Sequence, residues 1–230
     1  MDGCRAGWIA IALDERGAHS HLVASSIAEV ARRHPAGLLL VDIPIGLRDA
    51  EPDERRCDLE ARALLGPRGS SVFPAPCRAA IGLSTYREAS AENHRRTGRH
   101  LSKQSFSIAP RILDVEQYLR RSWASGPVIR EMHPEVCFWG LTARPMRHAK
   151  RTAEGAAERI AVLARHLPAA AAIVDEVTAA HRKSALRPDD VIDALVGAVT
   201  ARLGVERLRT LPARPEHDSK GLRMEIVYAV

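Results

Sequence analysis

Aromatic residues, long apolar runs and the common catalytic motifs are scarce or missing in this chain of 230 residues. Aromatics make up only 4% of it, which weighs against the stacking platforms on which many proteins hold single-stranded nucleic acid. No run approaches the roughly 18 consecutive apolar residues of a membrane span. Asp2 and Arg5 stand where the apolar part of a secretory signal would begin, so we expect no signal peptide.

Cysteine is also sparse, and its spacing excludes familiar metal and redox sites. The four cysteines contain no CxxC pair, which argues against a zinc knuckle and favours reduced thiols in a cytoplasmic protein. The motifs GxxxxGKS/T, GxGxxG, HExxH and GxSxG do not occur either. What the chain does have is a basic balance, with a net charge of +6. That charge suits a polyanionic partner such as nucleic acid, although an arginine-rich composition alone also explains it.

The first forty residues have the pattern of strands followed by a short helix. Residues 8–13 form a buried apolar run, and residues 19–24 can return beside it as the second strand of a hairpin. A serine, Ser25 or Ser26, then caps a helix. The continuous apolar run 38–42 predicts a strand inside a sheet that is covered on both faces.

The rest of the chain alternates helices with strands. Helices are expected at residues 51–65, 86–97, 108–123, 153–166, 169–181 and 188–203. Strands are expected at 128–133 and, as a final edge strand, at 224–230. Strands first and an alternation afterwards indicate an α/β fold with a mixed sheet. We expect one domain over residues 1–230, with residues 51–123 inserted into it as a helical block.

Acidic residues occur at three distant points where this fold would bring them to one site. Asp2 precedes the first apolar strand, Asp42 ends the run 38–42, and Asp190 and Asp193 share one face of the last helix. Converging carboxylates repel each other unless a cation neutralises them. The pattern therefore predicts a site for Mg²⁺ or Mn²⁺ held by Asp2, Asp42, Asp190 and Asp193. In the alternative interpretation, these residues only form turns or cap the helix.

Further polar residues are candidates for proton transfer and for substrate binding. Glu135 offers a further carboxylate, and His133 can exchange protons near neutral pH, although both are also ordinary at the end of a strand. A loop and two basic segments offer hydroxyl, amide and cationic groups that suit phosphate. The candidates for substrate binding are Arg68, Ser70, Ser71, Lys103, Gln104 and Lys150. Solvated surface residues have the same composition, so a structural role stays open for each of them.

Seven motifs in order resemble an uncharacterised family that is described as predicted RNase H-like nucleases. The motifs span residues 2–8, 42–47, 56–58, 68–74, 105–114, 131–135 and 190–194. The resemblance implies an RNase H-like mixed sheet, with three antiparallel strands first and parallel strands afterwards, flanked by helices. The segment Asp190 to Leu195 also resembles the closing helix of bacterial Holliday-junction resolvases, where such acids bind metal. The family's first strand begins several residues before its Asp, whereas only Met1 precedes Asp2 here, so this strand is either very short or begins upstream.

The resemblance and the acidic residues together favour metal-dependent hydrolysis of phosphodiester bonds in nucleic acid, DNA or RNA. Asp2, Asp42, Asp190, Asp193, Glu135 and His133 are then the expected catalytic residues. Two alternatives stay open: a non-catalytic regulator that binds nucleic acid or protein, and an ATP-dependent phosphotransferase of the actin-like type. We expect no membrane contact, and the sequence leaves open whether the chain forms a homodimer.

Overall fold

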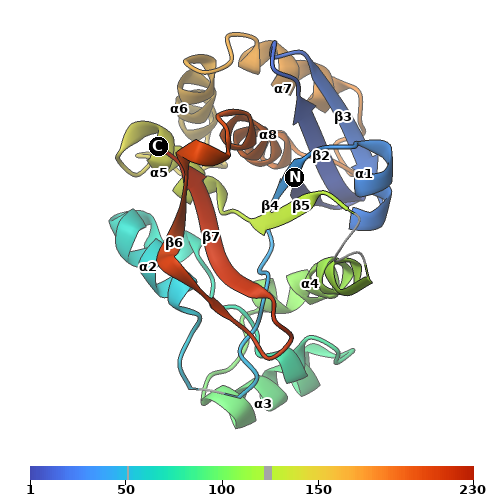
Figure 1. Cartoon of the computed structure of the whole chain (residues 1–230), viewed down its shortest axis with the longest axis vertical. Coiled ribbons are helices and arrows are strands. Elements are labelled where there is room, and N and C mark those ends of the chain that lie inside the picture. The colour runs from blue at the N-terminus through green and yellow to red at the C-terminus, as the bar shows by residue number, and fades with distance from the viewer. Residues whose placement is uncertain (51, 122–125) are drawn as a thin grey trace.

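The computed structural model describes residues 1–50, 52–121 and 126–230 and shows a mixed α/β fold (Figure 1). Three short antiparallel strands open the chain: β1 (Asp2–Cys4), β2 (Gly7–Leu13) and β3 (His19–Ala24). The predicted hairpin is confirmed, with Trp8 opposite Ala24 in the register. β1 has three residues, and the sequence had left open whether this strand is very short or begins upstream.

Two parallel strands continue the sheet beside β1. They are β4 (Leu38–Val41) and β5 (Val128–Glu131). The amino group of Met1 donates to the carbonyl of Leu40 at 2.9 Å, and the Asp42 amide donates to the carbonyl of Met1 at 3.0 Å. This alternation is the hydrogen-bond pattern of a parallel pair, so Met1 joins β1 to β4.

The C-terminal residues add a second antiparallel pair, β6 (Leu208–His217) and β7 (Arg223–Ala229). A parallel bridge between Met132 and Val227 connects β7 to the end of β5. The strands therefore follow one another in space as β3, β2, β1, β4, β5, β7, β6 (Figure 1). The predicted strand at 224–230 is confirmed, but its place at an edge is wrong because β6 lies outside it. Pro212, Pro215 and several charges hide β6 from a search for apolar runs.

Helices at both ends of the sequence cover the sheet. The first is α1 (Ile27–Arg33), and the later ones are α5 (Pro134–Thr142), α6 (Ala153–Ala164), α7 (Ala170–Ala179) and α8 (Pro188–Arg202). Ser26 caps α1 as predicted, since its hydroxyl accepts from the Glu29 amide at 3.3 Å. α8 is buried from Val191 to Thr200 and packs on β1, β2 and β4. None of the described helices is both long and apolar enough to cross a membrane.

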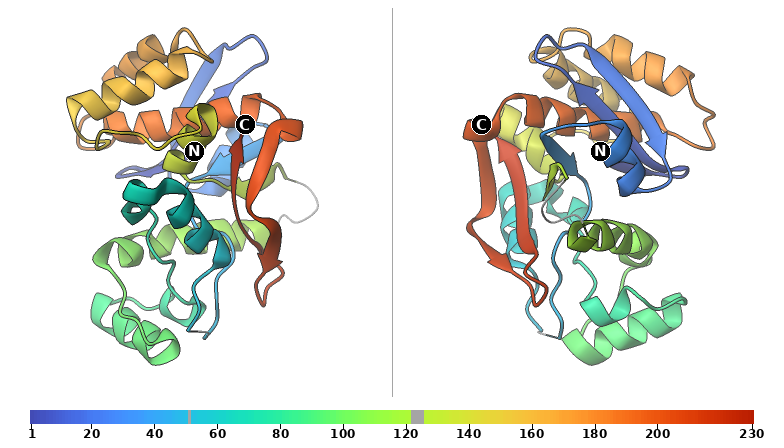
Figure 2. Two further views of the ribbon diagram at one scale, coloured as in Figure 1. Left: turned by 90° about the vertical axis from the view of Figure 1, so that its left-hand side faces the viewer. Right: turned by 45° about the vertical axis from the view of Figure 1, so that its right-hand side comes forward.

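The block between β4 and β5 is helical: its first helix packs beside β6 and β7, and the rest lies below the first strands of the sheet (Figures 1 and 2). Its helices are α2 (Arg56–Leu65), α3 (Tyr86–Thr97) and α4 (Lys103–Arg121), with short 3-10 turns η1 (Gly66–Ser71) and η2 (Arg78–Ala80). The helix that we expected from residue 51 begins at Arg56, and residue 51 itself lies outside the described residues. α4 begins five residues earlier than expected because Ser102 caps it, and the expected end at 122–123 lies outside the described residues.

One helix was missing from the sequence prediction. The strand that we expected at 128–133 ends at Glu131, because His133 becomes the N-cap of α5. Pro134 takes the first position of that helix, where its missing amide hydrogen costs nothing. His133 and Glu135 consequently lie at the start of a helix rather than at the end of a strand.

Candidate acidic site

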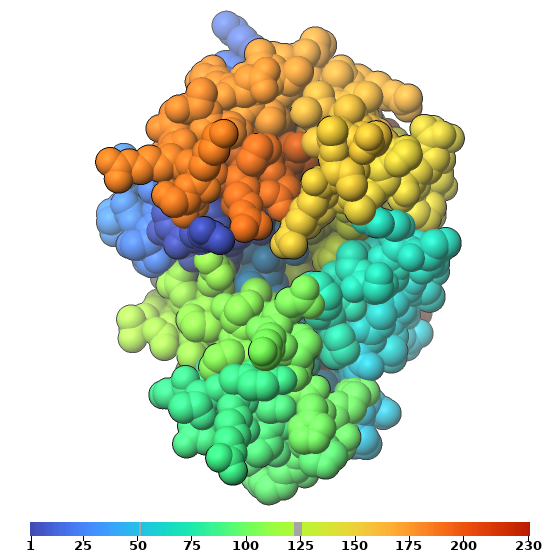
Figure 3. Space-filling model, turned by 180° about the vertical axis from the view of Figure 1, so that it is seen from behind, coloured from blue at the N-terminus to red at the C-terminus, as the bar shows by residue number. Residues whose placement is uncertain are grey.

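A pocket of about 280 Å³ brings the three acidic points together, since Asp2, Asp42 and Asp193 all line it. Asp2 belongs to β1, Asp42 directly follows the neighbouring β4, and Asp193 lies in the second turn of α8, which crosses both strands. Seen from behind in Figure 3, a recess separates the upper half of the molecule from the green helical block below. Early, central and late segments of the chain meet around it.

Asp193 is almost completely buried, and only one of its two carboxylate oxygens accepts a hydrogen bond within the described chain. Its side chain is 1% exposed, and its Oδ2 accepts a hydrogen bond from Lys150 Nζ at 2.6 Å. Its second oxygen, Oδ1, is buried and has no hydrogen-bond partner among the described residues. An unpaired buried carboxylate oxygen is costly, so this atom is a candidate ligand for a cation.

Burial and the repulsion of neighbouring carboxylates disfavour the charged forms of Asp2 and Asp193. Burial, followed by the charges of Asp42 and Asp193, raises the pKa of Asp2 well above its usual value. Burial raises the pKa of Asp193 to about 6, although Lys150 beside it acts in the opposite direction. Burial also lowers the pKa of Lys150, but the nearby carboxylates outweigh it and hold that pKa above its usual value. The pocket is thus poised to take up positive charge.

Asp2 and Asp42 are the two acids in the pocket that the protein leaves without a cationic partner. Neither forms an ion pair with any residue of the described chain. Asp2 Oδ1 accepts only from the adjacent Gly3 amide, at 2.6 Å. Two unpaired acids and the free oxygen of Asp193 therefore face one pocket.

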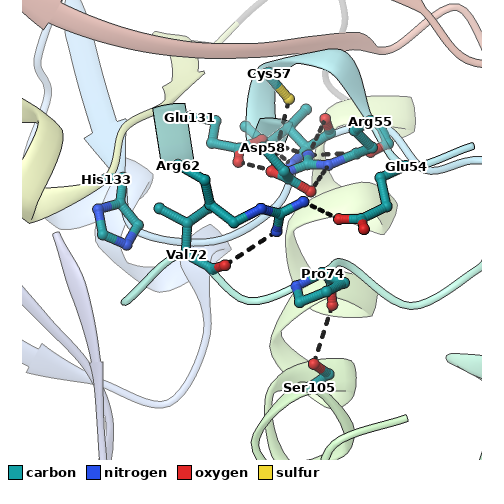
Figure 4. Close-up of polar contacts among 12 residues, drawn as sticks. Glu54, Arg55, Cys57, Asp58, Arg62, Val72, Pro74, Ser105, Glu131 and His133 are labelled. Carbon is teal, nitrogen blue, oxygen red and sulfur yellow. Dashed lines mark hydrogen bonds and ion pairs between the residues drawn. The ribbon is translucent and has the colours of Figure 1, made fainter. Parts of the chain in front are cut away.

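The other pocket acids, by contrast, are tied to arginines. Arg55, which is 3% exposed, donates to both oxygens of Glu131 at 2.7 and 2.8 Å and to Asp58 at 2.5 and 3.0 Å (Figure 4). Glu131 also accepts from the Ile45 amide at 2.6 Å. This network fixes the start of α2 against the end of β5 and forms one wall of the pocket. Sequence reasoning missed Arg55; the spacing of Arg55 and Asp58, three residues apart at a helix start, was the available signal.

Glu135 and His133 both line the pocket from the start of α5. Arg159 donates to Glu135 Oε1, while Glu135 Oε2 is buried without a hydrogen bond and lies 4.0 Å from Arg68 Nε. His133 Nε2 contacts the Ser71 carbonyl at 3.3 Å, and its Nδ1 is buried without a partner. Each residue thus keeps one free polar atom near the acids.

The candidates for substrate binding divide into two groups. Arg68, Ser71 and Lys150 line the pocket. All predicted site residues lie in the described part of the chain, and those that do not line the pocket are Ser70, Lys103, Gln104 and Asp190. Asp190 accepts a hydrogen bond from the Arg187 amide at 3.0 Å and so caps the start of α8.

Arg111 on α4 is a further pocket residue that sequence reasoning missed. It donates to the carbonyls of Cys4 and, at 3.3 Å, of Gly7, and its guanidinium lies 5.9 Å from the centre of the Trp8 ring. It therefore holds the turn between β1 and β2, next to Asp2, and adds a positive charge to the pocket wall. Only the packing of α4 against that turn reveals this role.

The donor atoms of the pocket are of the type that binds a hard cation, but in this structure they lie too far apart to bind one together. Carboxylate oxygens are the ligands that Mg²⁺ and Mn²⁺ prefer. In the described chain, however, no three ligand atoms of these acids lie within 4.8 Å of one another. The ammonium of Lys150 contacts Asp193 and takes part of the space.

These features define a mixed α/β protein with a buried carboxylate pocket where strand ends meet a covering helix. The chain belongs to the family described as "Protein of unknown function (DUF429)", whose model matches residues 1–217. Comparisons with curated proteins and with solved structures give no match. The match covers every residue that lines the pocket except Ile226, and the family description assigns no activity to it.

Proposed function

We propose that this protein is a metal-dependent phosphodiesterase that hydrolyses nucleic acid at the acidic pocket of an RNase H-like fold. One observation carries the proposal: Asp2 and Asp42, which form no ion pair within the described chain, line the same pocket as buried Asp193, whose Oδ1 has no hydrogen-bond partner among the described residues. Acids in this state need a cation to stay ionised together. A structural core has no use for such an arrangement, because it costs stability and stabilises nothing in return.

The strand order supports the fold part of the proposal. Three antiparallel strands are followed by β4 and β5, which run parallel to β1 beside it. This is the order that the resemblance implies for an RNase H-like sheet. α8 then crosses the sheet and brings Asp193 over the ends of β1 and β4.

Acidic and basic residues of the pocket would have different roles. Asp2, Asp42 and Asp193 would hold Mg²⁺ or Mn²⁺, with Glu135 nearby. When bound, the cation supplies Lewis-acid stabilisation and lowers the pKa of a coordinated water. Arg68, Arg111 and Lys150 give the pocket cationic groups that bind and orient a phosphodiester.

His133 and Ser71 complete the pocket wall. His133 Nδ1, which has no hydrogen-bond partner among the described residues, is the candidate group for proton transfer to or from the substrate. The net charge of +6 favours a polyanionic substrate and contact with its backbone rather than with its bases.

The test is a cleavage assay on single-stranded, duplex, branched and hybrid nucleic acids with Mg²⁺ or Mn²⁺. We expect cleavage of at least one substrate by the wild type, and a loss of roughly 100-fold or more in Asp42→Asn and Asp193→Asn. Asp190→Asn is the matched control, since it makes the same change one turn away on α8 and should keep its activity. Cleavage that survives in Asp42→Asn would contradict the proposal.

The contact between Lys150 and Asp193 favours a second candidate, a non-catalytic protein that binds nucleic acid on this fold. A lysine that permanently neutralises the acids would make a metal unnecessary. In that case the wild type binds nucleic acid without cleaving it, and Asp42→Asn binds equally well.

A further inference from the structure

A second group of possible metal ligands lies away from the pocket, where the outer strand β3 faces α7. His19 and His21 are two residues apart on β3, so their side chains point to the same face of the strand. Glu176 on α7 approaches them, with 3.2 Å between His19 Nε2 and Glu176 Oε1. One ligand atom from each of the three residues lies within 4.8 Å of the others. No other group in the described chain meets this condition.

We propose that His19, His21 and Glu176 bind a divalent transition-metal ion, with zinc as the best fit. Two imidazoles and one carboxylate form a donor set that zinc uses in proteins, with a fourth position left for water. Magnesium prefers oxygen ligands, so the donor set separates this site from the acidic pocket. None of these three residues, all of them described, lines that pocket.

An ordinary surface ion pair between His19 and Glu176 does not account for His21. The ring of His21 has no hydrogen-bond partner within the described chain, and it stands edge-on to His181 at 5.4 Å between centroids. His181 Nε2 is itself buried without a partner. Several imidazoles gathered beside one carboxylate repel each other when protonated, whereas a bound metal ion uses them in the neutral form.

Metal binding here would tie together distant parts of the chain. His19 and Glu176 are 157 residues apart in sequence, and β3 pairs only with β2 in the described sheet. The unfolded chain does not hold these ligands together, so an ion that binds the folded site stabilises the fold. The consequence is a metal-dependent attachment of the outer strand to α7.

The first experiment titrates Zn²⁺ into untagged protein in millimolar Mg²⁺, which occupies oxygen sites. We expect one Zn²⁺ per chain at micromolar zinc, and affinity at least about tenfold weaker in His21→Ala and in Glu176→Gln. His94→Ala is the control, because His94 belongs to another exposed histidine pair, stacked on His100 at 4.2 Å, with no carboxylate ligand. Binding that is absent in the wild type, or equally weakened in His94→Ala, overturns the proposal.

A second control and a second readout keep the two metal sites separate. Asp193→Asn should bind Zn²⁺ like the wild type, and a loss there would place the zinc in the acidic pocket and overturn the proposal. Zinc at about 100 times its dissociation constant should raise the melting temperature of the wild type by about 5 °C. The same addition should raise the melting temperature of His21→Ala by no more than about half as much, because that variant binds zinc at least about tenfold more weakly. An equal rise in that variant would contradict the assigned ligands.

Discussion

Lys150 places a positive charge inside the acidic pocket. Its ammonium lies 2.6 Å from Asp193 Oδ2, and the charges of Asp42 and Asp2 also attract it. Its side chain is 40% exposed, so it has room to leave the pocket. Under the proposed function, Lys150 and the metal ion would therefore compete for the same carboxylates.

Removal of this lysine charge should strengthen metal binding. We expect Lys150→Gln to bind Mn²⁺ about tenfold more tightly than the wild type, which corresponds to about 1.4 kcal/mol. Calorimetric titration without nucleic acid measures this directly. Lys183→Gln, a change of an exposed lysine outside the pocket, should leave the affinity unchanged. Weaker binding in Lys150→Gln would show that Lys150 supports the metal rather than competing with it.

Asp2 should destabilise the metal-free protein at neutral pH. Its pKa is raised in the folded state, so its contribution to stability is full below the unfolded pKa of about 4 and is lost as the pH rises through the folded pKa. Asp2→Asn removes this loss, and its amide oxygen can still accept from Gly3. We expect a gain of about 1 kcal/mol at pH 7, measured by urea unfolding in a chelator, which disappears near pH 4. A variant that is less stable at pH 7 would refute this account.

At the scale of elements, α8 shows why equivalent acids in a sequence acquire different roles. Pro188 and Gly204 mark its ends, and the apolar rows from Val191 to Leu203 predict its buried face. Asp190 and Asp193 share a face, so the sequence alone treats them alike. In the folded protein Asp190 turns back to the Arg187 amide, while Asp193, one turn further, lies over the strand ends. The rotation of α8 on the sheet decides this, and the sequence does not specify it.

Asp190 should therefore matter for stability rather than for metal binding. Asp190→Ala removes a capping acceptor and should lower the free energy of unfolding by about 1 kcal/mol, with Mn²⁺ affinity unchanged. Asp189→Ala is the neighbouring control, because its contact with exposed Arg151 is 3.7 Å long and should be worth less than about 0.5 kcal/mol. Loss of Mn²⁺ binding in Asp190→Ala would contradict this prediction and would show that Asp190 is a metal ligand.

The junction of α2 and β5 depends on a single buried guanidinium. Arg55 is the shared partner of Asp58 and Glu131, whose side chains are 2% and 5% exposed. Its removal would leave two buried carboxylates without a cationic partner, so we expect Arg55→Ala to cost about 3–5 kcal/mol in chemical unfolding. The adjacent Arg56→Ala, which loses only an exposed pair with Glu60, should change stability by less than about 0.5 kcal/mol. Similar stability of the two variants would contradict this view of the network.

At the scale of the whole molecule, local patterns predicted most elements, and long-range contacts decided the rest. The hairpin of β2 and β3, the strand β4 and the helix α8 follow from apolar periodicity and end signals. β6 and α5 did not, because prolines, charges and a short length hide them. The pairing of β7 with Met132, far apart in the chain, has no local signal at all.

For the candidate site, too, the sequence predicted some of the residues and missed others. Asp2, Asp42 and Asp193 could be proposed from the sequence because acids at strand ends and on a covering helix stand out in apolar surroundings. Arg55, Arg111 and Arg159 could not, because an arginine in an arginine-rich sequence gives no sign of being buried. These residues become visible only through the carbonyls and carboxylates that they contact.

The most direct test of the account is a calorimetric titration of Mn²⁺ into the wild type, Asp42→Asn, Asp193→Asn and Asp190→Asn at neutral pH. We predict saturable binding to the wild type and to Asp190→Asn, and its loss in the other two variants, since both acids face one pocket. A cation site in this pocket would be contradicted if Mn²⁺ still bound to Asp42→Asn and Asp193→Asn. It would also be contradicted if Mn²⁺ bound neither to the wild type nor to Lys150→Gln.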